Sequence, residues 1–193
     1  MKFILASANQ HKAEELNVLL SAGNLEILPA SEKVEVVEDG STFQENALKK
    51  AKEYFDKFGH PTVADDSGLV LPAKPDILGI HSARYAPEYL DYKDKNNFLI
   101  NEIKNLTGSD RDAYFICYLC FYISEEEVYF FEGRVHGVIA DTQSGVDGFG
   151  YDPIFIPDGC DGKSMAEVSE WKMTNSHRAK ACLSANKFFK EQR

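Results

Sequence analysis

Two adjacent carboxylates, Asp65 and Asp66, stand out as residues whose type and spacing could support chemistry. They follow a short apolar strand pattern at 61–64 and precede Ser67 and Gly68, the latter a residue that permits φ > 0 or the close approach of a ligand. Because side chains alternate across a strand, we expect the two carboxylates to face opposite sides, which leaves one principal carboxylate for a given cleft. An Asx-type turn or a helix cap is the alternative interpretation.

A second acidic cluster, Glu35, Glu38 and Asp39, lies just ahead of a helix that begins with a capping box formed by Thr42 and Glu45. Carboxylate oxygens of this kind suit Mg²⁺, which takes one or two protein carboxylates and leaves its other positions to water and substrate phosphates. A solvated charged loop is the competing interpretation.

The first loop of the chain offers an anion site. Asn9 can cap a helix over 10–22, and Lys12 lies in the first turn, where the helix dipole disfavours a cation. An anion bound by the free N–H groups of that turn would reverse this argument. An ordinary solvated lysine is the alternative.

Near the other end of the chain, basic and polar residues gather where Thr174 or Asn175 is expected to cap a terminal helix running to about residue 192. This arrangement suits anion binding, or is a capped helix with bystander charges. The residues are Lys172, Ser176, His177 and Arg178.

A glycine-dense loop at 145–153 carries aromatic side chains and an acid. Such a loop is either a plain connection or a mobile segment that stacks a planar ligand, and both interpretations stand at this point. Its candidate site residues are Phe149, Gly150, Tyr151 and Asp152.

The elements that must position these groups indicate an α/β fold with a mixed sheet, as one domain or as two lobes that share the sheet. A long antiparallel hairpin joins earlier βα units. We expect strands at 2–6, 25–29, 61–64, 112–124 and 127–140, and helices at 10–22, 42–58 and 92–106 besides the terminal one.

Composition narrows the class of protein. The chain has 193 residues, of which 44% are hydrophobic, so a sizeable core is expected. A formal net charge of -10 argues against nucleic-acid binding and against attachment to an anionic membrane. The sequence contains no stretch that could span a membrane, and the cytoplasm is the expected location. We expect the four cysteines to be buried and structural, because the pair at 117 and 120 lies in a strand pattern.

Taken together, these stretches resemble the inosine triphosphate pyrophosphatase family. The similarity runs from end to end of the chain, and its motifs occur in the family's order and spacing. They are Ala6-Ser7-Ala8-Asn9-Gln10-His11-Lys12, Thr42-Phe43-Gln44-Glu45-Asn46-Ala47, Ala64-Asp65-Asp66-Ser67-Gly68-Leu69, Ser82-Ala83-Arg84-Tyr85, Gly148-Phe149-Gly150-Tyr151-Asp152-Pro153 and Ser176-His177-Arg178.

The resemblance implies one pyrophosphatase domain over 1–193, with an elongated twisted sheet flanked by helices and two lobes with a substrate cleft between them. It implies Mg²⁺-dependent hydrolysis of dITP, ITP and XTP to the nucleoside monophosphate and pyrophosphate, by homodimers that cleanse the nucleotide pool. Glu38 and Asp66 would hold the metal, and Asp66 would accept the proton. The substrate would bind to Ser7, Ala8, Asn9, Gln10, His11, Lys12, Ser67, Phe149, Gly150, Tyr151, Asp152, Lys172, His177 and Arg178.

Within this assignment, Arg178 or a main-chain N–H would donate to the 6-oxo group of the base. The chain departs from the family's usual pattern in the 74–79 loop, at Trp171, and at Val37, where some relatives carry a glutamate. A non-catalytic nucleotide sensor and a house-cleaning pyrophosphatase for other modified nucleotides remain as alternatives. An aspartyl-nucleophile phosphatase is excluded because Asp65 and Asp66 do not form an Asp-x-Asp pattern.

Overall fold

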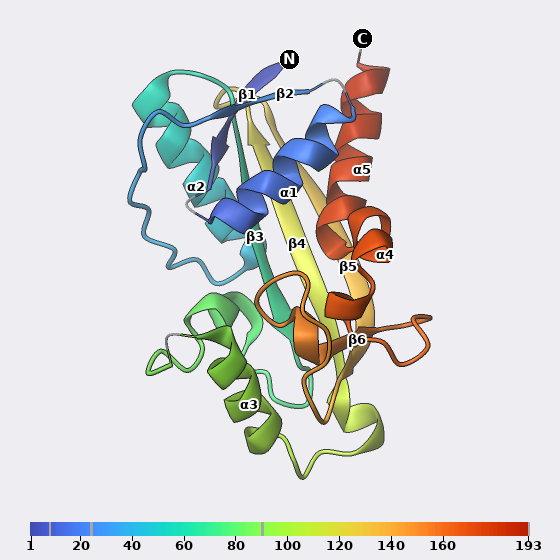
Figure 1. Ribbon diagram of the computed structural model, residues 1–193. Coiled ribbons are helices and arrows are strands. Elements are labelled where there is room, and N and C mark those ends of the chain that lie inside the picture. Colours follow the sequence, from blue (N-terminus) through green and yellow to red (C-terminus); the bar gives the residue numbers. More distant parts are fainter. Residues whose placement is uncertain (8, 24, 90, 193) are drawn as a thin grey trace. The chain divides into compact units, whose positions relative to one another are not determined.

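The computed structural model describes residues 1–7, 9–23, 25–89 and 91–192 (Figure 1). The strands are β1 (Lys2–Ala6), β2 (Glu26–Pro29), β3 (Thr62–Val70), β4 (Asp112–Tyr122), β5 (Val128–Ile139) and β6 (Phe155–Pro157). The α-helices are α1 (Gln10–Ser21), α2 (Phe43–Phe58), α3 (Tyr92–Glu102), α4 (Ser169–Asn175) and α5 (His177–Glu191), and short 3₁₀ turns cover Gly79–Arg84, Gly108–Arg111, Asp152–Ile154 and Met165–Glu167.

The strands form one mixed sheet in the order β2-β1-β3-β4-β5-β6. β1 pairs in parallel with β2 and β3, whereas β5 pairs antiparallel with β6. The predicted mixed α/β fold is therefore confirmed. The chain divides into two compact units, and β3, β4 and β5 contribute residues to both. Unit 1 comprises 1–67, 117–133 and 177–193, and unit 2 comprises 68–116 and 134–176.

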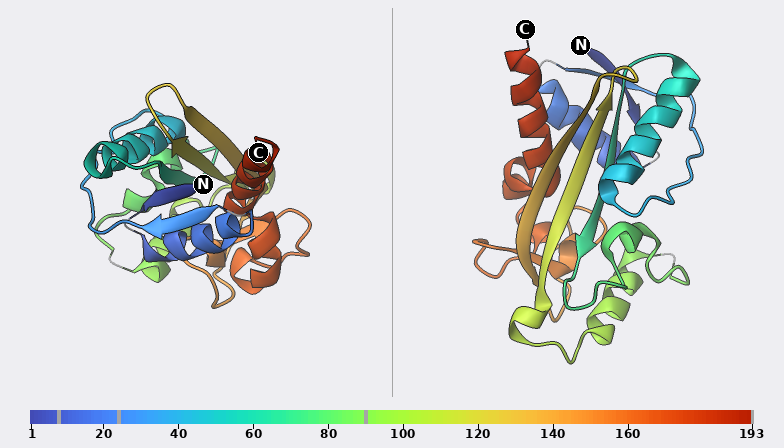
Figure 2. Two further views of the ribbon diagram at one scale, coloured as in Figure 1. Left: turned by 90° about the horizontal axis from the view of Figure 1, so that it is seen from above. Right: turned by 180° about the vertical axis from the view of Figure 1, so that it is seen from behind.

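Unit 1 has a hydrophobic cluster on each face of its part of the sheet. Helices α1 and α5 lie side by side on one face and α2 lies on the other (Figures 1 and 2). Strand side chains alternate between the clusters: Val63 packs in the α1/α5 cluster, and its neighbour Ala64 packs in the α2 cluster. This alternation sets the directions in which the residues that follow on β3 project.

Unit 2 has its own core. Leu99 of α3 and Ile103, the residue that follows α3, are fully buried in it, and they pack in one cluster with Phe115 of β4 and Phe155 of β6. Tyr151 belongs to the same cluster. The glycine-dense loop at 145–153 is therefore attached to a packed core through one of its own side chains.

The predicted helix starts are confirmed where a polar cap was identified. Asn9 Oδ1 accepts a hydrogen bond from Lys12 N at 3.1 Å, and Thr42 Oγ1 accepts one from Glu45 N at 3.1 Å. Asp91 caps α3 in the same way. The predicted capping box forms only in part. The Glu45 side chain accepts a hydrogen bond from Ser41 N at 2.6 Å and not from the N–H of the cap residue Thr42. Helix α3 also ends four residues earlier than predicted, at Glu102.

The strand that carries the two aspartates is longer than predicted. β3 continues through both carboxylates to Val70, so Asp65 and Asp66 lie within a strand and not at its end, in a turn or at a helix cap. Gly68 is part of the strand and is not among the described residues with positive φ. Aspartate is a poor strand former, but both carboxylates have cationic partners, and these tertiary contacts outweigh the local propensity.

The C-terminal segment also differs from the prediction. Residues 169–175 form a separate helix, α4, and α5 begins only at His177. Ser176 lies between them with extended backbone angles, φ -63° and ψ 163°, and this interrupts the helical hydrogen bonds. Thr174 and Asn175 are thus at the end of α4 and do not cap α5. Lys172 belongs to α4, so it does not share a helix start with His177 and Arg178.

The predicted role of the cysteines is confirmed, since all four are buried and free. Burial raises the pKa of the Cys117 thiol to about 12, which keeps it protonated and unreactive at neutral pH. None of the described helices is long and apolar enough to cross a membrane.

Candidate active site

Asp65 projects toward the α1/α5 face of unit 1 and is almost fully buried, with 2% of its surface exposed. Its Oδ2 lies 3.2 Å from Lys12 Nζ and 3.4 Å from an Arg178 guanidinium nitrogen, and it accepts a hydrogen bond from Ser67 Oγ at 3.0 Å. Burial alone would raise the pKa of this carboxyl, but the cations of Lys12, Arg178 and Lys50 outweigh it and hold the pKa well below the usual range. Asp65 is therefore a fixed anion and a poor proton acceptor.

Asp66 projects toward the opposite, α2 face and has a different environment. Its Oδ1 accepts a hydrogen bond from Lys50 Nζ at 3.0 Å. Its Oδ2 is buried and has no hydrogen-bond partner among the described residues. Here burial outweighs Lys50 and Lys12, and the pKa of Asp66 is raised. Of the two neighbouring carboxylates, Asp66 is the better proton acceptor.

Lys50 is a functional candidate that the sequence analysis missed. Its ammonium also lies 3.5 Å from Glu38 Oε1, so one cation links the carboxylates of Glu38 and Asp66. Burial disfavours the charged form of Lys50, but the surrounding carboxylates, Asp66 first, raise its pKa above the ordinary value. A signal existed in the sequence: Lys50 is in i+4 and i−4 register with Asn46 and Tyr54, the buried face of α2.

These contacts bear on the choice of metal ligands. Glu38 contacts the Lys50 ammonium, which also pairs with Asp66, whereas Asp39 pairs with Lys49 on the exposed surface. No group of three or more His, Cys, Asp or Glu side chains suited to a metal occurs in the described ranges. Two carboxylates lie around one positive charge, and one buried Asp66 oxygen has no partner within the described residues. This arrangement fits an ion that needs only one or two protein ligands. A cavity of about 570 Å³ lies beside this group and is lined by Glu38, Lys50 and the 33–37 segment.

The predicted phosphate loop follows β1 and leads into α1. Ser7 precedes the helix and Asn9 caps it, while Gln10, His11 and Lys12 form its first turn. Ala8 lies outside the described residues. The Lys12 side chain is 18% exposed and its ammonium is held beside Asp65, which explains how a cation is tolerated at a helix start. Ser7 and Gln10 also line a cavity of about 600 Å³.

Arg178 lies in the first turn of α5 and is 1% exposed. One guanidinium nitrogen is 2.5 Å from Glu15 of α1, and the other donates to Ser67 Oγ at 3.0 Å besides its contact with Asp65. Arg178 thus joins α1, β3 and α5 within unit 1. Glu15 was not identified from the sequence, although it lies one turn after Lys12 on the same helix. His177, 4% exposed, begins α5.

The remaining predicted residues are in unit 2. Lys172 Nζ lies 4.6 Å from the centre of the Phe149 ring and donates to Asp152 Oδ2 at 2.8 Å. The same carboxylate oxygen accepts from Phe149 N at 2.8 Å. Tyr151 is 4% exposed and its hydroxyl donates to Ser82 O at 2.7 Å. The loop therefore presents a half-buried aromatic ring that a buried ion pair orients, and Gly150 follows that ring directly.

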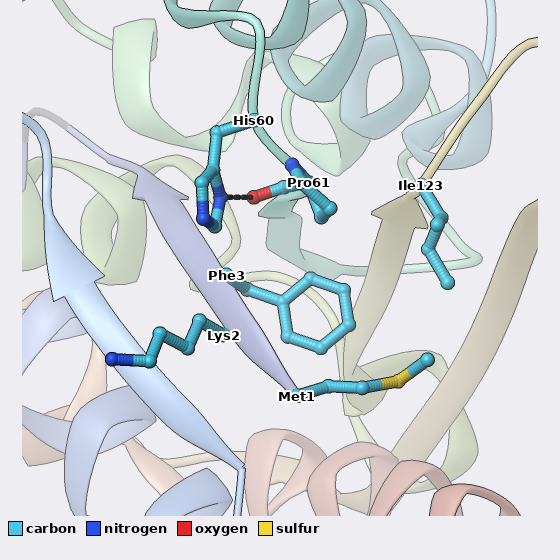
Figure 3. A pocket seen from close by; sticks show the side chains of 6 residues that line it. All are labelled: Met1, Lys2, Phe3, His60, Pro61 and Ile123. Atoms are coloured by element: carbon cyan, nitrogen blue, oxygen red, sulfur yellow. Dashed lines mark hydrogen bonds between the residues drawn. The ribbon is translucent and has the colours of Figure 1, made fainter.

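A separate small cavity of about 260 Å³ lies at the start of β1, the strand end away from the phosphate loop. Figure 3 shows its side chains, among which His60 Nδ1 donates to Pro61 O at 3.1 Å. Lys2 pairs with Glu26 on the exposed surface. None of the predicted site residues borders this cavity, and we do not assign it to the reaction. Its lining is Met1, Lys2, Phe3, His60, Pro61 and Ile123.

Comparisons with known proteins identify the family of the chain. The model of the Ham1 family matches residues 3–188. A protein named dITP/XTP pyrophosphatase from Clostridium perfringens is 41% identical over 191 residues, 93% of each chain. Another of that name, from Aquifex aeolicus, is 38% identical and covers 94% of this chain and 93% of its own. Among solved structures, a HAM1 protein from Coxiella burnetii has a TM-score of 0.89 at 32% identity, with 99% of each chain covered. The Ham1 protein of Staphylococcus aureus has a TM-score of 0.87 at 35% identity, with both chains fully covered.

Proposed function

The chain belongs to the Ham1 family, and we propose that it hydrolyses non-standard purine nucleoside triphosphates, dITP, ITP and XTP, to the nucleoside monophosphate and pyrophosphate. The names of the curated relatives support this substrate class. The observation that carries the proposal is the pair Asp65 and Asp66, which are adjacent in the chain but differ in direction, partners and pKa. Such a pair separates a fixed anion from a proton acceptor.

In the proposed mechanism, residues of α1 and β3 in unit 1 bind the phosphates. Lys12 and the positive end of the α1 dipole receive the anion, and Asp65 keeps the Lys12 ammonium in place. Ser67 Oγ is oriented by Asp65 and Arg178 and adds a polar contact. A tetra-anionic triphosphate explains why an acidic protein places buried cations here.

Asp66 is the proposed general base. It takes a proton from the attacking water as the oxygen of that water forms a bond to phosphorus and the bond between the α- and β-phosphates breaks. The pyrophosphate leaves with the electron pair of the broken bond. Lys50 keeps Asp66 and Glu38 close together and stays charged beside them.

Mg²⁺ is the proposed cofactor, with Glu38 and Asp66 as its protein ligands. When bound, it would neutralise phosphate charge and orient the triphosphate. Asp66 Oδ2, which has no hydrogen-bond partner in the described part of the chain, and the convergence of both carboxylates on one cation support this choice.

The base is assigned to the loop in unit 2 and to residues near it in sequence. Phe149 would stack on the purine, with Asp152 and Lys172 setting the ring's position and Gly150 and Tyr151 completing the loop. His177 and Arg178 complete the proposed substrate set. We further propose a homodimer that clears such nucleotides from the cytoplasmic pool, and the support for both is the family resemblance.

Turnover of ITP, measured as pyrophosphate release with and without Mg²⁺, tests the function. An enzyme of the proposed kind releases pyrophosphate only when Mg²⁺ is present. Saturable ITP binding without product would instead identify a nucleotide sensor. The same assay with a panel of modified pyrimidine triphosphates tests the other alternative. If these are cleaved faster than ITP, the site belongs to a different house-cleaning reaction.

A further inference from the structure

The loop around Phe149 has a backbone that must be held in place. Gly145, Gly148 and Gly150 all have positive φ, between 67° and 81°, so the ring lies between two left-handed glycines. A Cβ at Gly148 would lie 2.2 Å from Asp152 Oδ2, which shows how closely the loop folds over that carboxylate. Glycines at these positions make the loop feasible but do not fix it, because they adopt many other conformations in solution.

One side of the Phe149 backbone is fixed by Asp152. Its Oδ2 accepts from Phe149 N and from Lys172 Nζ, both at 2.8 Å. This carboxylate is 3% exposed and its charge is balanced by the lysine. The contact fixes the peptide group that precedes the ring.

The other side is fixed by Asn96 of α3. This side chain is 1% exposed, and its Nδ2 donates to Gly150 O at 3.1 Å and to Gln143 Oε1 at 3.3 Å. Gln143 in turn donates to Lys93 O at 2.9 Å and to Asn97 Oδ1 at 2.7 Å. The carbonyl of the residue after Phe149 is therefore tied to the first half of α3, directly and through Gln143.

We propose that Asn96 is a positioning residue for the Phe149 platform and, through that ring, for binding of the purine base. The inference rests on the stacking role proposed above for Phe149. Asp152 accepts from the N–H of Phe149 and Asn96 donates to the C=O of Gly150, so the two glycines beside the ring cannot rotate it away from its binding orientation. Asn96 acts through the loop and does not touch the substrate.

This role predicts a particular kinetic signature. Stacking on the base is made in the bound substrate and in the transition state alike, so loss of the anchor weakens both equally. Asn96→Leu, which keeps the approximate shape and removes the donor, should raise KM for ITP about tenfold and leave kcat within about twofold. KM for XTP should rise by a similar factor, because a stacked ring does not distinguish the two bases.

Asn186→Leu is the matched control. Asn186 Nδ2 also donates to one main-chain carbonyl, Leu19 O at 2.8 Å, and its Oδ1, like that of Asn96, has no partner among the described residues. Asn186 lies in α5 of unit 1, outside the loop and outside the hydrogen bonds described above. Each variant should lose stability through its own lost hydrogen bonds, but only Asn96→Leu should change KM.

Gln143→Met provides a second variant if Asn96→Leu does not fold, because Gln143 is only half-buried and holds Asn96 from outside the core. It should raise KM less than Asn96→Leu, with kcat again unchanged. An unchanged KM in both loop variants, or an equal rise of KM in Asn186→Leu, overturns the positioning role. Phe149→Ala distinguishes failure of the Asn96 inference from failure of the proposed function. If Phe149→Ala leaves KM unchanged, the stacking role of Phe149 is wrong. If Phe149→Ala raises KM and Asn96→Leu does not, only the Asn96 inference is wrong.

Discussion

Asp65 and Asp66 show how far two identical neighbouring side chains can differ. The alternation of a strand predicts that they face opposite sides, and their separate partners confirm it. Their opposite pKa shifts were not predictable from the sequence, because they depend on cations that come from α1, α2 and α5. Lys12 is more than fifty positions away from Asp65 in the chain, and Arg178 more than a hundred. The titration of each aspartate is thus a property of the tertiary structure.

Asp66→Asn tests the proposed base. The amide keeps the size of the side chain but cannot accept the proton, so we expect kcat for ITP to fall by roughly 10²- to 10⁴-fold or more while nucleotide affinity stays within about tenfold. Steady-state kinetics and direct binding measure the two effects separately. Asp56→Asn is the control, because Asp56 is an exposed carboxylate paired with Lys52 on α2. A variant at Asp66 that keeps half of the wild-type kcat would remove this residue from the mechanism.

Asp65 should matter for stability and its dependence on pH. Its pKa is lower in the folded protein than the ordinary value of 3.8, so its stabilising contribution is present above that value and is lost as the pH falls below it. Asp65→Asn leaves Lys12 and Arg178 with one carboxylate fewer, and breaking a buried pair of this kind costs about 3–5 kcal/mol at pH 7.

Urea unfolding at pH 7 and pH 3 measures this effect. The wild type should lose more of its unfolding free energy between these pH values than Asp65→Asn does, because the variant has no carboxylate to protonate at this position. Asp56→Asn again serves as the control and should behave like the wild type. Equal losses in the wild type and Asp65→Asn would show that Asp65 keeps an ordinary pKa in the folded protein.

At the scale of the elements, prediction succeeded where a local signal marks an end. Asn9, Thr42 and Asp91 each combine a polar cap with an apolar stripe, and each begins a helix as predicted. Prediction from the sequence failed where contacts with distant parts of the chain determine the bounds of an element. β3 runs on through Asp65 and Asp66 because lysines and an arginine from other elements compensate their charges. The terminal helix was expected to be capped by Thr174 or Asn175, and α4, which ends at Asn175, was not predicted.

Lys12→Ala tests the first turn of α1 as the phosphate site. A contact with the triphosphate is shared by all substrates, so KM for ITP and XTP should rise by similar factors, about ten- to hundredfold for the loss of a charged hydrogen bond. Lys93→Ala is the matched control, because Lys93 also lies in a first helical turn, that of α3, but outside the proposed site. A change in KM for only one of the two substrates would show that the lysine reads the base, and the phosphate assignment would be wrong.

For the whole molecule, composition indicated the class of protein but not the division of its chain. The net charge of -10 disfavours polyanionic macromolecular partners, and the cations buried around Asp65 and Asp66 are each paired with carboxylates. The sequence predicted a single domain with two lobes, and the contacts divide the chain into two compact units whose bounds were not predicted. Three strands cross from one unit to the other, and no change in composition marks those crossings. We therefore propose that the two units fold as one domain.

Cooperative unfolding follows from the shared strands. β3 supplies Thr62–Ser67 to unit 1 and Gly68–Val70 to unit 2, and β4 and β5 are divided in the same way. If unit 1 unfolded alone, the strands of unit 2 would be left without the continuation of their backbone hydrogen bonds. We expect a single two-state transition in which damage to either unit destabilises both.

Trp171, the sole tryptophan, lies in α4 and so reports on unit 2, whereas far-UV circular dichroism follows the whole chain. Asp65→Asn, a change in unit 1, should lower the urea midpoint seen by Trp171 fluorescence as much as the midpoint seen by circular dichroism. Leu99→Ala, a change at a fully buried position of unit 2 that costs about 2–5 kcal/mol, should likewise lower both midpoints together. If Asp65→Asn leaves the fluorescence midpoint in place while the dichroism signal separates into two steps, the units unfold independently and the chain contains two domains. Coincident midpoints in both variants require that the strands transmit the loss of stability from one unit to the other, as expected of elements that belong to both cores.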